Sequence, residues 1–245
     1  MGIAQGALKF MFEEGKKERW KGSVLTLGKQ DIAFTLDILN QESLKHSYVL
    51  NPLGKKAQAP SSLSTDKHNL SDAIFFSLLG FSHVESMDKS AYEGADIIHD
   101  LNISEPPQNS KDKYDLVLDG GTLEHVFHIP NALSCISSMV KTCGRIIHIS
   151  PMSNCADHGF YSFSPTLFVD YYSLNKFSIE NIVYISFQQD PCMDEWSYFS
   201  YDKSPITDLG PGVYFLMACV RKLPNSTSGS VPQQGHYVNK AWLTA

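Results

Sequence analysis

The sequence predicts an α/β domain with a mostly parallel sheet and helices on both of its faces, and three observations support this. Short β-rich runs alternate with helix-like segments between residues 23 and 221, as in a parallel sheet with helical crossovers. Residues 114–119 have a continuous apolar centre, which is typical of a strand covered on both faces. The chain has 245 residues, of which 42% are hydrophobic, so it can bury a substantial core.

The first half of the chain contains strands and helices in alternation, interrupted by one long loop. The expected elements are a strand at 23–27, a helix at 30–44, a short strand at 48–50, a helix at 71–79, and strands at 83–88 and 95–99. Ser71 is well placed to cap the second helix. The segment 51–69 is rich in Pro, Ser, Lys and Ala, and we expect an inserted loop there that folds over the active site as a lid.

The second half continues the alternation and ends in two β-rich runs. The expected elements are a strand at 114–119, a helix at 130–141, a strand at 145–149, a helix at 164–174, and strands at 179–187 and 213–221. Pro130 suits the first turn of its helix, and Gly144 follows the helix end. The insertion 188–212 contains Trp196 and Tyr198, which suit either a ligand wall or a loop packed on the sheet.

Both ends of the chain differ in composition from the central domain, residues 21–223. Residues 1–20 form a predicted N-terminal helix, and its many charged side chains indicate a surface helix that could contribute to a homodimer. Residues 224–245 begin with a stretch rich in Pro, Ser and Gly and are predicted to be a flexible tail.

The composition excludes several classes of protein. There are 20 basic and 26 acidic residues, so bulk attraction to nucleic acid or to an anionic membrane is not expected. No apolar run approaches the ~18 residues of a membrane span, and no secretory segment is evident, which predicts a cytoplasmic protein. The five cysteines include no C-x-x-C pair, so neither a disulfide framework nor a structural zinc site is expected.

Three predicted strands end in residues suited to ligand binding. In open parallel sheets, ligands bind beyond the carboxyl ends of the strands. Gly28 follows the first strand and permits close approach of the backbone to a ligand. Asp88 could accept hydrogen bonds from a ribose diol, and Asp100 could accept from an adenine amino group. Each acid alone fits a cap or a solvated loop, but the ordered set indicates a nucleoside site.

The same segments resemble the motifs of class I S-adenosylmethionine-dependent methyltransferases. The matching segments are 24–28 (motif I), 86–88 (II), 94–102 (III), 114–126 (IV, with the run Gly-Gly-Thr-Leu-Glu-His-Val) and 143–151 (the fifth strand). The resemblance implies a doubly wound, seven-stranded sheet with a final antiparallel pair, 179–187 and 213–221. It also implies S-adenosylmethionine as cofactor, with Leu101, Asp119, Gly120 and Gly121 beside it.

Motif I departs from the family pattern because a single glycine is followed by Lys29 and Gln30. We expect Gln30 or a main-chain group to replace what a second glycine allows. This departure favours, as an alternative, a noncatalytic binding protein of the same fold. A nicotinamide-dependent oxidoreductase or epimerase is a weaker alternative, because no G-x-G-x-x-G follows the first strand.

Candidate catalytic residues follow the fourth and fifth strands. Methyl transfer is an in-line displacement that needs a positioned acceptor and a group to remove its proton. His125 is the predicted general base, with His128, His158, Glu124 and Tyr161 as further candidates. Alternatively, Glu124 and His125 only hold the cofactor loop in place. The expected acceptor is an oxygen or nitrogen atom of a small metabolite or natural-product intermediate.

A metal site is not predicted from the sequence. His125 and His128 would share a face on a helical turn and could bind a metal together with His158 or Asp157. The spacing matches no fixed metal-binding motif, however, so the expectation is a methyltransferase without a metal.

Overall fold

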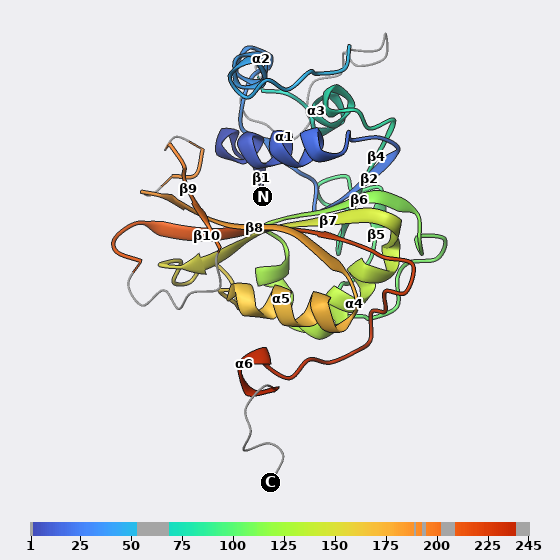
Figure 1. Ribbon diagram of the computed structural model, residues 1–245. Coiled ribbons are helices and arrows are strands. Elements are labelled where there is room, and N and C mark those ends of the chain that lie inside the picture. The colour runs from blue at the N-terminus through green and yellow to red at the C-terminus, as the bar shows by residue number, and fades with distance from the viewer. Residues whose placement is uncertain (1, 53–68, 189, 193–194, 202–208, 239–245) are drawn as a thin grey trace.

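The computed structural model describes residues 2–52, 69–188, 190–192, 195–201 and 209–238. The strands of its central sheet are β2 (Ser23–Leu27), β4 (His83–Asp88), β5 (Ile97–Ile98), β6 (Tyr114–Gly120), β7 (Val140–Ser153), β8 (Ser178–Phe187), β9 (Ser197–Ser200) and β10 (Val213–Arg221). They form one eight-stranded sheet in the order β5-β4-β2-β6-β7-β10-β8-β9 (Figure 1).

The pairing of the strands confirms the predicted fold class. Strands β5, β4, β2, β6 and β7 are mutually parallel, whereas β10 runs antiparallel to both of its neighbours, β7 and β8. Strand β10, which follows β8 in the sequence, therefore lies between β7 and β8 in the sheet, which agrees with the final antiparallel pair that the sequence resemblance implies. The structure adds one strand to the expected seven, because β9 of the 188–212 insertion pairs with β8.

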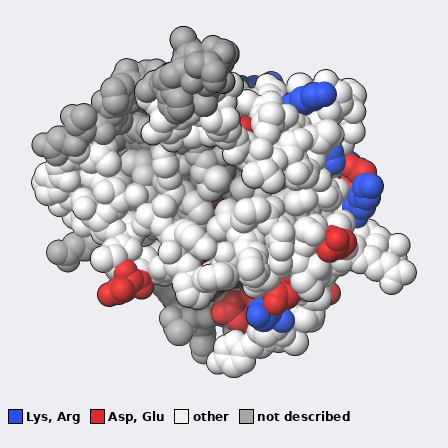
Figure 2. All heavy atoms as spheres, turned by 90° about the horizontal axis from the view of Figure 1, so that it is seen from below, with Lys and Arg blue, Asp and Glu red and all other residues white. Residues whose placement is uncertain are grey.

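Helices cover both faces of the sheet, so the fold is doubly wound. The helices are α1 (Leu8–Lys17), α2 (Leu36–Lys45), α3 (Asp72–Leu79), α4 (Ile129–Met139) and α5 (Pro165–Leu174), with short turns η1 (Gln5–Ala7), η2 (Leu123–His125) and α6 (Gly235–Val238). The first three lie on one face, and α4 and α5 lie on the other (Figure 1). Seen from the side of α4 and α5, the surface carries few charged side chains (Figure 2).

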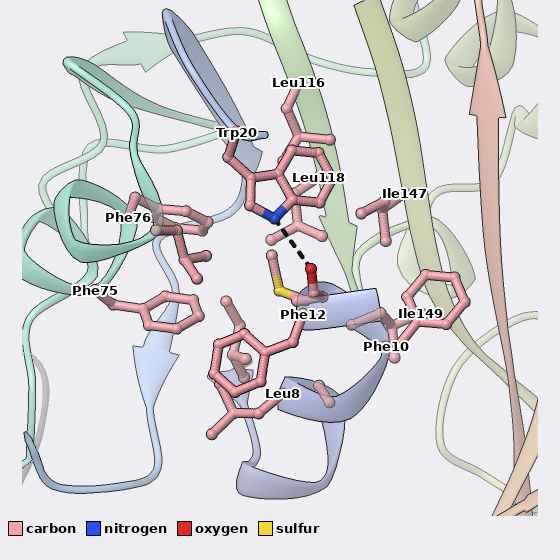
Figure 3. Close-up of a cluster of buried hydrophobic side chains, with 14 of the residues drawn as sticks. Leu8, Phe10, Phe12, Trp20, Phe75, Phe76, Leu116, Leu118, Ile147 and Ile149 are labelled. Atoms are coloured by element: carbon pink, nitrogen blue, oxygen red, sulfur yellow. Dashed lines mark hydrogen bonds between the residues drawn. The ribbon is translucent and has the colours of Figure 1, made fainter. Parts of the chain in front are cut away.

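Two apolar clusters sandwich the sheet. Along β6, Leu116 and Leu118 face the cluster under α1 and α3, whereas Val117 faces the cluster under α4 and α5. The alternation follows from the period of two in a strand, and the burial of both sides explains why the centre of the strand, Leu116–Leu118, is continuously apolar. Trp20 lies in the first cluster, where its indole N–H donates to the Met11 carbonyl at 3.0 Å (Figure 3).

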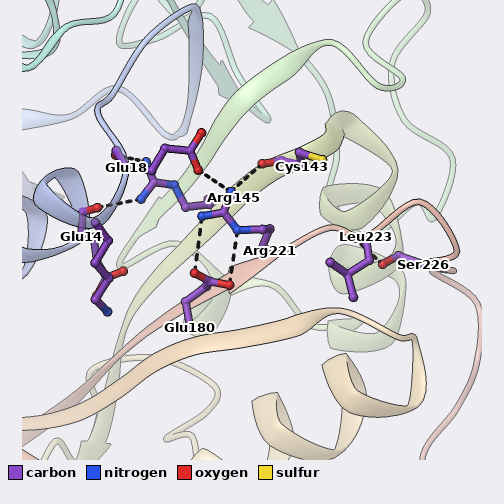
Figure 4. Close-up of polar contacts among 9 residues, drawn as sticks. Glu14, Glu18, Cys143, Arg145, Glu180, Arg221, Leu223 and Ser226 are labelled. Atoms are coloured by element: carbon purple, nitrogen blue, oxygen red, sulfur yellow. Dashed lines mark hydrogen bonds and ion pairs between the residues drawn. The ribbon is translucent and has the colours of Figure 1, made fainter.

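The prediction that the N-terminal helix is a surface helix is wrong. One face of α1 is fully buried, and its buried apolar residues are Leu8, Phe10, Met11 and Phe12. The end of the helix is fixed by Arg145 of β7, whose guanidinium donates to the carbonyls of Glu14 and Glu18 at 2.9 and 2.8 Å (Figure 4). The same guanidinium lies 3.6 Å from the centroid of the Trp20 ring. The prediction failed because the charged residues of this segment alternate with apolar ones that lie together on one face of the helix.

The helix predicted from residue 30 begins later, at Leu36. Residues Asp31–Ile32 form strand β3, which pairs in parallel with β1 (Gly2–Ile3). Thr35 directly precedes the helix as its N-cap, and its hydroxyl accepts the Ile38 N–H. The short strand expected at 48–50 is also wrong, because those residues are not in a strand.

The remaining element predictions hold with shifted ends. The Ser71 hydroxyl accepts the Ile74 N–H and caps α3 as predicted. Strand β7 is longer than the predicted 145–149, and β5 is shorter than 95–99. Within the described ranges, no helix is long and apolar enough to cross a bilayer.

The domain boundaries at residues 20 and 223 stay predictions, as do the insertions at 51–69 and 188–212. Most of the expected lid, residues 53–68, lies outside the described residues. The segment after 223 contacts the domain: the Asn175 side chain donates to the Ser230 carbonyl at 2.9 Å, and Gly235 N–H donates to Asp170 at 2.8 Å.

Candidate functional site

Three motif-bearing turns are tied together at the carboxyl ends of adjacent strands. Gly28, after β2, donates its N–H to the Met87 carbonyl of β4 at 2.7 Å. On the other side, the Thr122 hydroxyl donates to the Leu27 carbonyl at 2.7 Å. The turns after β2, β4 and β6 therefore lie along one edge of the sheet, at the carboxyl ends of its strands, where open α/β sheets bind their ligands.

Gln30 closes the motif I turn. Gly28 has φ 73°, a conformation that favours glycine. The Gln30 side chain is buried and donates from Nε2 to the Leu27 carbonyl at 2.8 Å, while its Oε1 accepts no hydrogen bond from the described residues. A Cβ atom added at Gly120 would lie 2.4 Å from this oxygen. Gln30 therefore bridges the ends of β2 and β6, where the family pattern has a second glycine.

The two predicted nucleoside-binding acids are only partly buried. Asp88 accepts the Ser90 N–H at 2.9 Å through Oδ1. Asp100 accepts from the Asn102 backbone and side chain at 2.9 and 2.7 Å and pairs with Lys89 at 3.0 Å. The Asn102 N–H, followed by the Lys89 ammonium, lowers the pKa of Asp100 to about 2, so this carboxylate is ionised at neutral pH. The neighbouring Leu101 lies in the apolar core beneath this edge.

Asp119 shapes the turn after β6 and is itself fully buried. Its Oδ1 accepts the N–H groups of Thr122 and Leu123 at 2.9 and 3.2 Å, which fixes the turn at Gly120 and Gly121. The other oxygen of the carboxylate, Oδ2, lies 2.9 Å from Nδ1 of His148. A carboxylate oxygen can only accept, so the imidazole donates here.

Sequence analysis missed the two residues that complete this buried chain. His148 lies beside Asp119 in the register of β6 and β7, and its Nε2 is 2.7 Å from the Tyr172 hydroxyl of α5. Both side chains are fully buried. A polar residue at a buried position of the apolar run 145–149 was the available signal for His148, whereas nothing in the sequence paired Tyr172 with it.

The structure brings together three of the predicted catalytic residues, which we call the Glu124 cluster: Glu124, His125 and His158. Glu124 Oε1 lies 3.4 Å from Nε2 of His158 and 4.0 Å from Nε2 of His125. The two imidazole rings are 5.6 Å apart between centroids. The segment carrying His158 is held in place by Phe160, whose N–H donates to the Glu124 carbonyl at 2.7 Å.

Burial perturbs the electrostatics of this cluster. Glu124 has no exposed surface, whereas the side chains of His125 and His158 are 44% and 48% exposed. Burial, and next the charge of Asp119, raises the pKa of Glu124 to about 8. Burial, and next the proximity of His158, lowers the pKa of His125, which favours the neutral imidazole at pH 7.

His128 and Tyr161 lie outside the cluster. The chain is extended at Val126 after η2, so His125 and His128 do not share a helical face. The Tyr161 hydroxyl donates to the Phe127 carbonyl at 2.8 Å. Beside it, the exposed rings of Phe127 and Phe160 meet edge to face, with centroids 5.7 Å apart. This pair offers an apolar wall near the cluster.

The aromatic residues of the 188–212 insertion pack elsewhere. Trp196 stacks on Phe187 of β8, and the Tyr198 hydroxyl donates to the Gly6 carbonyl. Together with residues of α1 and α2 they line a hollow of about 500 Å³ that includes none of the predicted site residues. Trp196 and Tyr198, in the described part of the insertion, therefore pack against the sheet and the N-terminal segment.

Comparisons with known proteins give matches among solved structures. No protein-family model and no curated protein matches the chain. One similar structure is the 1,6-didemethyltoxoflavin-N1-methyltransferase of Burkholderia thailandensis with bound S-adenosylhomocysteine: 12% identity over 90% of this chain and 79% of that one, TM-score 0.44. Another is the N-methyltransferase NodS of Bradyrhizobium japonicum: 9% identity over 89% and 94%, TM-score 0.44.

Proposed function

We propose that this protein is an S-adenosylmethionine-dependent methyltransferase that modifies an oxygen or nitrogen atom of a small-molecule acceptor. One observation supports the proposal above the others. The sheet has the class I strand order, and the turns bearing Gly28, Asp88 and Asp119 are hydrogen-bonded into one edge at its carboxyl ends. A cofactor lying across that edge would meet all the turns at once.

The three acids would have different roles in binding the cofactor. Among the described residues Asp88 engages one oxygen with the Ser90 N–H, which leaves the other to accept from a ribose hydroxyl. Asp100 stays ionised and keeps its loop folded through Asn102, and its carboxylate is the candidate acceptor for the adenine amino group. Asp119 acts indirectly, since it orients the Gly120–Gly121 turn toward the methionine part of the cofactor.

The Glu124 cluster is the candidate site for handling the acceptor. In the transfer, a lone pair of the acceptor heteroatom forms a bond to the methyl carbon while the carbon–sulfur bond breaks and sulfur keeps its electron pair. The acceptor must also lose a proton, and a neutral His125 with an exposed ring can take it. The aromatic pair Phe127 and Phe160 would hold an apolar or planar acceptor next to it.

One observation favours a second function, noncatalytic binding on the same fold. Gln30 occupies the space at Gly120 that the methionine part of the cofactor would approach. A protein whose motif I turn is closed in this way would exclude the methionine part of S-adenosylmethionine, so it would bind a ligand at this edge without transferring a methyl group.

The test is calorimetric titration of the full chain with S-adenosylhomocysteine, with NAD run in parallel. We expect saturable binding of the former alone. Asp88→Asn should weaken it by about 5- to 150-fold, the equivalent of a lost hydrogen bond to a buried or charged group at roughly 1–3 kcal/mol. Asp112→Asn is the matched control, since Asp112 pairs with Lys222 away from the strand ends. Absence of binding in the folded wild type would refute the proposal.

A further inference from the structure

We propose that Glu124, His125 and His158 form a binding site for a divalent transition-metal ion. Two imidazoles and one carboxylate are the donor set of many zinc and iron sites. The ligand atoms of these three side chains all lie within 4.8 Å of one another. No metal motif exists in the sequence, because Glu124 and His125 are adjacent whereas His158 arrives from the loop after β7.

The distances fit a metal with little movement. Metal–nitrogen and metal–oxygen bonds of about 2.0–2.2 Å place neighbouring ligand atoms about 3.0–3.5 Å apart. Glu124 Oε1 and His158 Nε2 already lie at 3.4 Å. His125 Nε2, at 4.0 Å from the same oxygen, needs only a small rotation of an exposed side chain to complete the set.

A second observation, independent of this spacing, is that the carboxylate of Glu124 is buried without a hydrogen bond. Its side chain has no exposed surface, and within the described part of the chain neither Oε1 nor Oε2 accepts a hydrogen bond. Burying a polar group in this way costs free energy unless a partner compensates for it. A cation between the carboxylate and the imidazoles would be that partner.

The local backbone holds the loop bearing His158 against Glu124. The Phe160 N–H donates to the Glu124 carbonyl, and Gly159 packs so closely that an added Cβ would lie 2.8 Å from that carbonyl oxygen. Only a glycine at 159 allows the loop bearing His158 to approach Glu124 this closely.

The site is open on one side, unlike a closed structural zinc site. The half-exposed rings of His125 and His158 leave a path for the ion and free coordination positions for water or a substrate atom. This consequence rests on the proposed function. An acceptor oxygen bound to the metal would lose its proton more easily, and His125 would then serve as a metal ligand and no longer as the base.

The test measures metal directly on the full chain. The protein is stripped with a chelator, and binding of Zn²⁺, Mn²⁺ and Co²⁺ is followed by calorimetry and by the visible absorption of Co²⁺. We expect one ion per chain, and a loss of affinity of at least about tenfold in His158→Ala and in His125→Ala. Because both side chains are half exposed, these variants should fold, whereas Glu124→Gln changes a buried group and needs a check of folding.

The matched control is His83→Ala. His83 Nε2 also lies 3.4 Å from a glutamate oxygen, that of Glu85, but this carboxylate already accepts from Tyr114 and Lys113 at 2.6 Å each. We expect unchanged metal binding in this variant. Wild-type protein that binds no ion, or binding that survives in the double variant His125→Ala/His158→Ala, would overturn the proposal. S-adenosylhomocysteine titrations on the same samples separate this outcome from failure of the proposed function.

Discussion

The variant Tyr172→Phe removes one buried hydroxyl and tests whether α5 helps to position the Gly120–Gly121 turn. The hydroxyl is fully buried, and burial raises its pKa, so it keeps its proton and hydrogen-bonds with Nε2 of His148 at 2.7 Å. Without it, Nε2 of His148 loses its hydrogen-bond partner in the core, which costs about 1–3 kcal/mol. His148 is then held by Asp119 alone, and the Gly120–Gly121 turn that Asp119 fixes becomes less well ordered.

Tyr171→Phe is the control, because it removes the hydroxyl of the residue directly before Tyr172. The Tyr171 hydroxyl donates to the Ser228 carbonyl at 2.8 Å, on a half-exposed segment where water can replace it, so the expected loss is only about 0.5–1.5 kcal/mol. We expect S-adenosylhomocysteine affinity to fall about three- to tenfold, or by up to ~1.4 kcal/mol, in Tyr172→Phe. In Tyr171→Phe it should not change.

Both quantities are accessible with purified protein. Urea denaturation gives the free energy of unfolding, and calorimetry gives the affinity. Equal affinities in the two variants, with Tyr172→Phe destabilised as expected, would show that the buried chain supports the core but does not position the turn. That result would refute the role assigned to Asp119.

Three further predictions concern the fold and the motif I turn. Arg145→Met should lower the free energy of unfolding by about 2–4 kcal/mol, because one buried and one partly buried carbonyl lose their donors. Lys21 is exposed, so Lys21→Met should change the free energy of unfolding by less than ~0.5 kcal/mol, and similar denaturation midpoints for the two variants would contradict this prediction. Gly120→Ala should destabilise the protein because the added Cβ would meet the Gln30 side chain, and Gln30→Ala should relieve part of that loss. A double-mutant cycle should therefore give a coupling of at least ~0.5 kcal/mol, and additive effects would exclude the contact between residues 30 and 120. Burial alone would raise the pKa of Asp115, but hydrogen bonds from a lysine and a backbone N–H hold it below its usual value. The stabilisation is therefore present above pH ~4 and lost as the pH falls further. In Asp115→Asn, the free energy of unfolding should fall less steeply than in the wild type between about pH 5 and pH 2, and an equal fall in both proteins would contradict this prediction.

The fold could be predicted from the sequence because its signals are local. The strand 114–120 has a continuous apolar centre, Leu116–Leu118, and the structure shows that both sides of this centre are buried. The N-terminal helix was misjudged because its charges were counted without reference to its faces. The apolar residues of this helix are buried. Among its charged residues, Glu14 is also buried and accepts a hydrogen bond from the Asn181 side chain.

The candidate site was predictable in part, for a physical reason. Glu124 and His125 were selected from a single run of sequence, and His158 from its position after the fifth strand. Their convergence depends on how the loop after β7 folds back, which has no local signature. The same holds for Tyr172, whose contact with His148 joins an α5 residue to a strand 24 residues earlier.

The position of β10 has a consequence for synthesis of the chain. This strand is the last to leave the ribosome, yet it is hydrogen-bonded between β7 and β8. Until residue 221 has emerged, both neighbours present unpaired strand edges, which are templates for pairing with other chains. A nascent chain stopped at residue 212 should therefore bind chaperones and aggregate, whereas one stopped after residue 223 has every strand of the sheet available.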